Sequence, residues 1–175
     1  MGSCAINART IVMAKTILIP TDLHVGSLSA LKAAIGTTGS EQLNVILMHA
    51  EHLPDGITDL LFHSPRRELR RRMGSAFKEA LAVLRNHHER RLVGICVEPF
   101  NGGNAKAFDQ FLRARGVDEI HVSGSYRLRR GSRSLDPMPL IRAASAPLII
   151  HGSSQAVVPG DAATVVDHLQ FLFDR

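Results

Sequence analysis

The sequence predicts an α/β fold, a three-layer sandwich in which helices cover both faces of a parallel sheet. Short apolar runs typical of strands alternate five times with segments whose apolar residues recur at helical spacing. Right-handed crossovers are expected to join the strands. A chain of 175 residues and 19.1 kDa has the size of one domain with a substantial core.

The first predicted unit is strand, helix, strand. Residues 17–20 and 43–50 are apolar runs that indicate buried strands. Between them, Gly26-Ser27 offers a helix N-cap, and Gly36 and Gly39 end that helix.

One long helix is predicted next, after an irregular connection over residues 51–63. Ser64-Pro65 starts it, because proline suits the first helical position. Residues 92–97 form the third strand, which Pro99 closes, and Cys96 within it is most simply a small core residue. The apolar stripe of the helix consists of Leu69, Met73, Phe77, Ala80, Leu81 and Leu84.

The last two units are shorter. Asn104 can cap a helix over residues 105–115, and residues 120–122 form the fourth strand. A short helix from Asp136 through Ala144 leads to the fifth strand at residues 147–151.

Three regions are predicted along the chain. Residues 1–14 form an N-terminal extension, residues 15–152 form the α/β domain, and residues 153–175 form a C-terminal helical extension. Asp161 caps an amphipathic helix in the last region. The apolar side of that helix needs a surface to cover, either on its own sheet layer or on a second subunit.

Charge and composition narrow the classes of partner. The net charge is +5 and the pI about 9.9, with arginines clustered in residues 66–72 and 127–133. Such clusters attract phosphate-bearing partners, although a solvated helix face is the simpler interpretation of the first cluster. One tyrosine and no tryptophan leave little surface for base stacking, so nucleic acid is not favoured as a partner.

Location follows from what the sequence lacks. No apolar run approaches the roughly 20 residues of a membrane span. The first residues contain no recognisable export signal, so we expect a cytoplasmic protein without membrane contact. With only Cys4 and Cys96, we expect no disulfide.

Four stretches, taken in order, resemble the universal stress protein family. Residues 15–35 are similar to its opening strand, Pro-Thr-Asp turn and Ala/Leu helix. Residues 45–50 resemble its second strand, which ends in His and a small apolar residue. Residues 116–125 resemble its fourth strand, and residues 140–150 its closing helix and last strand.

The resemblance covers about residues 15–152 and carries several expectations. It implies a Rossmann-like, five-stranded parallel sheet in the order 3-2-1-4-5. It also implies a homodimer that uses the edge strand near residues 147–151. In members that bind ATP, an Asp closing the first strand faces adenine, and the residue after the second-strand His also contributes. Asp22 and Ala50 occupy these positions.

The phosphate-binding loop of the family departs from its pattern in this chain. The family pattern is G-x2-G-x9-G-[ST] after the fourth strand. Gly124 matches the first glycine and Ser125 follows it. Arg127 replaces the second glycine, and Ser134 stands near the final small residue of a loop about three residues short.

The missing glycine bears on nucleotide binding. Glycine allows positive φ and lets main-chain N–H groups approach phosphate oxygens closely. Arginine has a Cβ and a long side chain, so that approach is lost, and we expect no ATP binding in the family manner. The arginines of the loop could instead hold phosphate, or another anion, by side-chain hydrogen bonds.

Asp22 and Ser125 each allow a structural alternative. Asp22 could bind a ligand, or it could cap main-chain N–H groups near Gly26. Ser125 could bind a phosphate, or it could be the turn residue that ends a strand. Both alternatives stay open at the level of the sequence.

Enzymatic chemistry is not indicated. The nine histidines show no zinc-ligand spacing, and there is no Gly-x-Ser-x-Gly motif and no P-loop. Glu98-Pro99 stands where a response regulator would have its phosphoacceptor Asp.

We therefore expect a non-enzymatic binding or regulatory protein linked to stress, without metal or resident cofactor. The alternative is a nucleotide-binding protein with weak ATPase activity that uses Asp22 and the arginine-rich loop, and nucleic-acid binding through the arginines is a weaker third option.

Overall fold

The computed structural model describes residues 14–52, 64–131 and 133–152. The predicted N-terminal extension, apart from Ala14, and the C-terminal extension lie outside the described residues. Cys4, the helix capped by Asp161 and most of the predicted connection at residues 51–63 lie outside them too.

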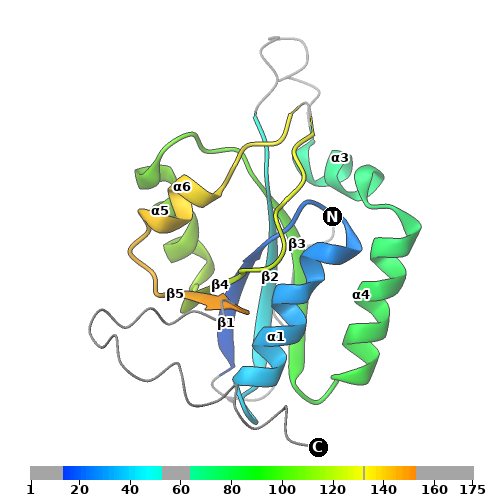
Figure 1. Ribbon diagram of the computed structural model, residues 1–175. Coiled ribbons are helices and arrows are strands. Elements are labelled where there is room, and N and C mark those ends of the chain that lie inside the picture. The colour runs from blue at the N-terminus through cyan, green and yellow to red at the C-terminus, as the bar shows by residue number, and fades with distance from the viewer. Residues whose placement is uncertain (1–13, 53–63, 132, 153–175) are drawn as a thin grey trace, which may run out of the picture.

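Five parallel strands form one sheet, in the order β3-β2-β1-β4-β5 (Figure 1). In register, Ile17 of β1 lies opposite Val45 of β2 on one side and Glu119 of β4 on the other. The predicted fold class and strand order are confirmed. The carboxyl ends of β1 and β4 therefore open at the same edge, where open α/β sheets bind ligands. The strands are β1 (Lys15–Pro20), β2 (Leu43–Ala50), β3 (Leu92–Phe100), β4 (Glu119–Ser123) and β5 (Leu148–His151).

Helices cover both faces of this sheet (Figure 1). One face packs against α1, α3 and α4, with Leu31, Leu69 and Phe77 buried there. The other packs against α5 and α6, with Phe108 and Leu112 buried there. The helices are α1 (Ser29–Thr37), α3 (Pro65–Arg72), α4 (Ser75–His87), α5 (Ala105–Arg115) and α6 (Met138–Arg142).

The first helix begins later than the sequence suggests. Val25–Leu28 form a short 3-10 helix, η1, and α1 starts at Ser29. The Ser27 hydroxyl donates to the His24 carbonyl at 2.8 Å and lies 2.7 Å from the Thr21 hydroxyl. Ser27 therefore holds the turn after β1 instead of capping α1.

The prediction of one long helix after Ser64-Pro65 is wrong. The chain forms two helices, and Met73 and Gly74 between them are extended, with ψ of 107° and 161°. Glycine is a poor residue for a helix interior because it loses the most backbone freedom on folding. The break at Gly74 redirects the chain so that Arg72 and Phe77 line one cavity.

The third strand continues through Pro99 to Phe100 instead of ending before it. β3 lies at the sheet edge, where proline is tolerated because one side of the strand has no neighbour. Cys96 in this strand is half-buried and packs against the α5 side of the core.

Side-chain oxygens accept main-chain N–H groups at the starts of two helices, although only α5 has a side-chain N-cap. Asn104 accepts a hydrogen bond from the Ala107 N–H at 2.8 Å, as predicted. Asp136 accepts one from the Met138 N–H at 3.0 Å. The helix after it, α6, ends at Arg142, short of the predicted Ala144.

A chain of polar side chains crosses the sheet from β5 through β4 to β1. His151 Nε2 lies 2.8 Å from His121 Nδ1, His121 Nε2 lies 3.1 Å from the Glu119 carboxylate, and Lys15 Nζ lies 2.6 Å from the same carboxylate. An ionised carboxylate only accepts, so His121 carries its proton on Nε2 and accepts from His151 on Nδ1. Both imidazoles are buried, and burial lowers the pKa of each.

Candidate functional site

Residues 124–136, here called the crossing loop, run across the carboxyl ends of β4, β1 and β2 (Figure 1). The loop starts where the Gly124 N–H donates to the His151 carbonyl at 2.7 Å. It finishes beside β2, where the Leu135 N–H donates to the Ala50 carbonyl at 3.0 Å. Between these two anchors it passes over the end of β1.

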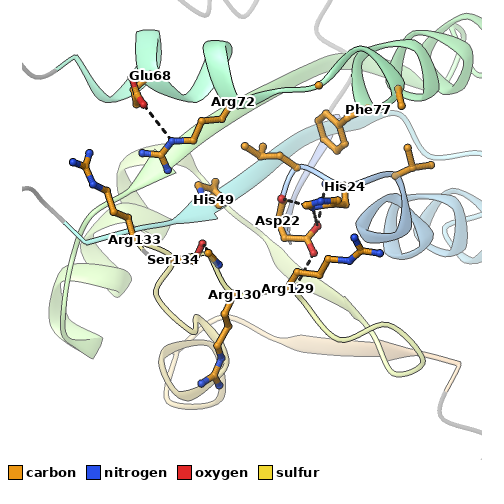
Figure 2. Close-up of a pocket in the computed structure, with 15 residues that line it drawn as sticks. Asp22, His24, His49, Glu68, Arg72, Phe77, Arg129, Arg130, Arg133 and Ser134 are labelled. Carbon is orange, nitrogen blue, oxygen red and sulfur yellow. Dashed lines mark hydrogen bonds and ion pairs between the residues drawn. The ribbon is translucent and has the colours of Figure 1, made fainter.

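Asp22, at the end of β1, is bound by the crossing loop itself. Its Oδ2 accepts hydrogen bonds from the Tyr126 hydroxyl at 2.7 Å and the Arg129 main-chain N–H at 2.8 Å. Its Oδ1 accepts from the His24 N–H at 3.0 Å (Figure 2). Burial would raise the pKa of Asp22, but the hydrogen bonds from Arg129 and Tyr126 outweigh it and the pKa is lowered. The carboxylate therefore stays ionised as an acceptor for the loop.

Tyr126 packs directly on Gly26 in the turn after β1. A Cβ at residue 26 would lie 2.3 Å from Cε2 of the ring, so only glycine leaves room for the tyrosine. Burial and the hydrogen bond to Asp22 raise the pKa of Tyr126 to about 12. Ring and hydroxyl together fix the loop over β1.

The backbone next to Asp22 is strained. Leu23 has φ of 63°, alone among the described non-glycine residues in being positive. The left-handed conformation costs a residue with a Cβ about 1–2 kcal/mol. The Leu23 N–H donates to the Thr21 hydroxyl at 3.0 Å, and the Leu23 side chain is buried in the core. Both contacts stabilise this strained conformation. Strain of this kind is typical of functional sites.

Little space remains between Asp22 and Ala50, where the resemblance places adenine, although Asp22 also borders the larger cavity described below. The cavity between these residues and the loop residues Leu128 and Leu135 has a volume of about 20 Å³. Small-molecule pockets measure about 300–1,000 Å³. The groups that meet Asp22 from the crossing loop are a phenol and a main-chain N–H, not arginine side chains.

The other predicted residues lie at different places along the loop. Gly124 and Arg127 line a cavity of about 650 Å³ beside α6. Ser125 lies on neither cavity wall, and its hydroxyl is 3.2 Å from that of Ser123. Ser134 accepts the Gly131 N–H at 3.1 Å, which tightens the loop where it approaches β2. The loop thus separates Gly124 and Arg127 from Ser134.

A larger cavity, of about 840 Å³, lies between the crossing loop and helices α3 and α4 (Figure 2). We call it the arginine cavity. Arg129 and Arg133 line it from the loop, Arg72 and Phe77 from the helices, and Asp22 from the end of β1. Sequence reasoning missed Arg72 and Phe77 because it placed them in one continuous helix.

Two buried carboxylates next to this region are compensated by arginines. Glu51 is 1% exposed, and its Oε2 accepts from Arg72 at 2.8 Å. Arg72 Nε also donates to Glu68 at 3.4 Å. Glu98, likewise buried, meets Arg115 at 2.7 Å. Glu98 also lies 3.4 Å from Arg66. Removing Arg72 would therefore leave the charge of Glu51 buried without its arginine, whereas Glu98 has two arginines.

Structural neighbours were found among known proteins. No protein-family model matches this sequence, and no curated protein matches it. The chain is similar to a universal stress protein from Burkholderia pseudomallei, at 19% identity and a TM-score of 0.45, covering 81% of this chain and 98% of that one. It is also similar to universal stress protein UspA from Lactobacillus plantarum, at 11% identity and a TM-score of 0.46, covering 78% and 96%.

A third neighbour is a universal stress protein in complex with cAMP, at 19% identity and a TM-score of 0.41, covering 78% of this chain and 95% of that one. The observed strand order is the one that the resemblance implied. At these identities and TM-scores nothing about the neighbours' sites carries over to this chain, so its site is argued from its own residues.

The described residues contain neither a candidate membrane span nor a cluster of metal-ligand side chains. In the part of the chain that the structure describes, no helix is both long and apolar enough to cross a membrane. Within the same ranges, no three His, Cys, Asp or Glu side chains gather closely enough to hold a metal ion.

Proposed function

We propose that this protein is a non-enzymatic binding or regulatory domain of the universal stress protein type, linked to the response to stress, whose adenine position is closed by its own crossing loop. One observation carries the proposal: Oδ2 of Asp22 already accepts hydrogen bonds from Tyr126 and Arg129. ATP then does not bind in the manner of the family.

The closure has an energetic basis. For adenine to reach Asp22, both donors must leave the carboxylate. Hydrogen bonds to a charged acceptor contribute about 1.5–3 kcal/mol each. Two of them oppose adenine entry by about 3–6 kcal/mol, which is a large part of the binding energy of a micromolar ligand.

A thermal-shift titration with ATP and Mg²⁺ tests the proposal. We expect no rise in Tm up to about 10 mM ATP. A site with a Kd of about 0.1 mM would give about 2.7 kcal/mol of stabilisation at that concentration, or roughly 5–11 °C for a chain of this size. A rise of that size in the wild type would contradict the closure.

The second candidate is a nucleotide-binding protein with weak ATPase activity that uses Asp22 and the crossing loop. Its support is the group of arginine side chains on the loop, among them Arg127 and Arg129, which can donate to phosphate. A neighbour of the same fold is in complex with cAMP. An ATP-dependent shift that disappears in Asp22→Ala and in Arg127→Gln, together with phosphate release, would favour this candidate.

We also propose a cytoplasmic homodimer that pairs through the edge strand β5. Edge strands present unpaired main-chain groups that can add a second chain. Ile150 of β5 is 50% exposed, which is consistent with a covered position in a dimer. Light scattering after gel filtration measures the oligomeric state, and we expect Ile150→Lys to yield monomers.

A further inference from the structure

We propose that His121 and His151, here called the histidine latch, hold the edge strand β5 to the sheet while at least one of the two imidazoles is neutral, and release it when both are protonated. The inference goes beyond the proposed function, because it assigns an acid-sensitive device to a part of the fold far from Asp22. It rests on the proposed homodimer in one respect, that release of β5 also weakens pairing between subunits.

His151 anchors β5. The strand has four residues and lies at the sheet edge (Figure 1). Leu148 and Ile149 are half-buried and Ile150 is 50% exposed, whereas His151 is buried. Within the ranges that the structure describes, the bond to His121 is the only side-chain hydrogen bond that β5 makes. A segment with few buried apolar contacts opens at low free-energy cost, so the hold on β5 depends strongly on His151.

The hydrogen bond between the imidazoles tolerates one added proton but not two. In the neutral pair, His151 Nε2 donates to His121 Nδ1 across 2.8 Å. One added proton still leaves one of these two facing nitrogens without a hydrogen, so one of them can accept. A second proton puts an N–H on both, and neither can accept. Two cations then face each other with ring centroids 5.0 Å apart, and they repel.

The groups around the latch do not compensate a second charge. Glu119 accepts from His121 at 3.1 Å, but the same carboxylate is already paired with Lys15 at 2.6 Å. Helix α1 packs on this face of β4 and β5, and its sole ionisable side chain, Lys32, is exposed and is itself a cation. Two further carboxylates act on Lys15, at the far end of the row: Glu41 and Asp118.

The direction of the pH effect follows from burial. Burial lowers the pKa of both imidazoles, and the hydrogen bond from His121 to Glu119 opposes this without cancelling it. The folded chain therefore takes up these protons below the ordinary value of 6.5, whereas the unfolded strand takes them up more readily. The latch is fully closed above pH 6.5 and opens as the pH falls below that value.

Release of β5 also frees the start of the crossing loop. The Gly124 N–H donates to the His151 carbonyl at 2.7 Å, so the residue that carries the latch also anchors the loop. The other anchor, from the Leu135 N–H to the Ala50 carbonyl, does not involve β5. Acid therefore loosens the edge strand and the first part of the loop together, while β1, β2 and β3 stay paired.

Hydrogen exchange of the full chain, followed by mass spectrometry, tests the latch. Exchange is compared at about pH 7.5 and about pH 5, on either side of the ordinary histidine range, after correction for the intrinsic effect of pH. We expect the protection of β5 and of Gly124 to fall by about 10-fold or more at the lower pH, because a hydrogen bond is lost and a repulsion is gained. The protection of β1 and β2 should stay the same.

A variant that cannot take the second proton tests the cause. In His151→Gln, the amide can donate to neutral His121 from Nε2 or accept from protonated His121 at Oε1, so the link survives in both states. We expect this variant to keep its protection at both pH values. The matched control is His87→Gln, because His87 and His88 also lie 3.3 Å apart but are exposed at the end of α4. It should leave the acid-induced fall unchanged.

A second measurement does not depend on a variant. NMR titration of the wild type with ¹³C-labelled histidine should show the two imidazoles of the latch titrating as a coupled pair, both below the ordinary value of 6.5. Independent titration of both at the ordinary value would overturn the latch.

The exchange data decide the proposal on their own. Equal protection of β5 at both pH values in the wild type would overturn it, and so would an undiminished fall in His151→Gln. A loss shared by β1 and β2 would mean that the whole chain unfolds, which also refutes a local release. Light scattering at the same two pH values tests the consequence for assembly separately. We expect dimers at the higher pH and monomers at the lower, and monomers at both would contradict the homodimer while the exchange result still judges the latch.

Discussion

Substitution of Tyr126 by phenylalanine removes one hydrogen bond and little else. The ring stays packed on Gly26, while Oδ2 of Asp22 loses a donor at 2.7 Å and keeps the Arg129 N–H. A hydrogen bond to an ionised acceptor contributes about 1.5–3 kcal/mol. We therefore expect Tyr126→Phe to lower the free energy of unfolding by that amount, and the Tm by roughly 3–12 °C.

Urea unfolding followed by circular dichroism measures the loss. The urea midpoint should fall while the m-value stays the same, because the exposed surface on unfolding hardly changes. The control is the double variant with Asp22→Asn. Since the ionised acceptor is already gone there, Tyr126→Phe should cost less in that background, and the difference is the coupling energy of the pair.

The same interaction has a spectroscopic test in the wild type. Tyr126 is the only tyrosine of the chain, so the absorbance of tyrosinate reports this residue alone. Its pKa of about 12 should move toward the ordinary value of 10 in Asp22→Asn. A wild-type pKa near 10, together with a Tyr126→Phe loss below about 0.5 kcal/mol, would refute the loop closure.

Three further changes test other parts of the structure. Gly26→Ala places a Cβ 2.3 Å from the Tyr126 ring, so the ring must move; we expect a loss of about 1–3 kcal/mol in urea unfolding, and an unchanged midpoint would contradict the packing. Arg72→Ala leaves Glu51 buried without its cation and should cost about 3–5 kcal/mol, whereas Arg71→Ala, whose side chain is 78% exposed, should cost less than about 1 kcal/mol; equal losses would exclude the buried pair as the cause. Because burial lowers the pKa of His121 in the folded state, the unfolded chain binds the proton more readily, so stability is full above pH 6.5 and falls as the pH drops below that value. His121→Phe should flatten this fall in unfolding measured across pH, and an identical pH dependence in the variant would show that His121 is not responsible.

The architecture could be predicted from the sequence because its signals are local. Apolar runs at residues 17–20, 43–50 and 120–122 specify strands, and the residues around Asp22 and Gly124 support the resemblance that implies strand order. The two wrong predictions, one continuous helix and a third strand that ends before Pro99, also came from local sequence signals. Gly74 interrupts a periodic apolar stripe that by itself favours one helix, and Pro99 is tolerated because β3 is an edge strand.

The site was predictable only in part, because its main contacts span long stretches of sequence. Asp22 could be singled out from its position after a strand, but its partner Tyr126 lies 104 residues away. The sequence also contains no measure of how far a loop will fold back over neighbouring strands. Only the structure shows that the loop main chain at Arg129 reaches the carboxylate, and that Arg72 lies in the same cavity wall as Phe77.

The hydrogen bonds to Asp22 make residues 124–136 a tethered competitor for any molecule that seeks the end of β1. The loop competes at every concentration of that molecule, because it belongs to the same chain. The apparent affinity is the affinity of the open site multiplied by the fraction of time that the loop is open. With two bonds of about 1.5–3 kcal/mol each, that fraction is roughly one in a hundred to one in ten thousand. Weakening the tether would therefore uncover affinity already latent in the fold, without adding a single new contact to the incoming molecule.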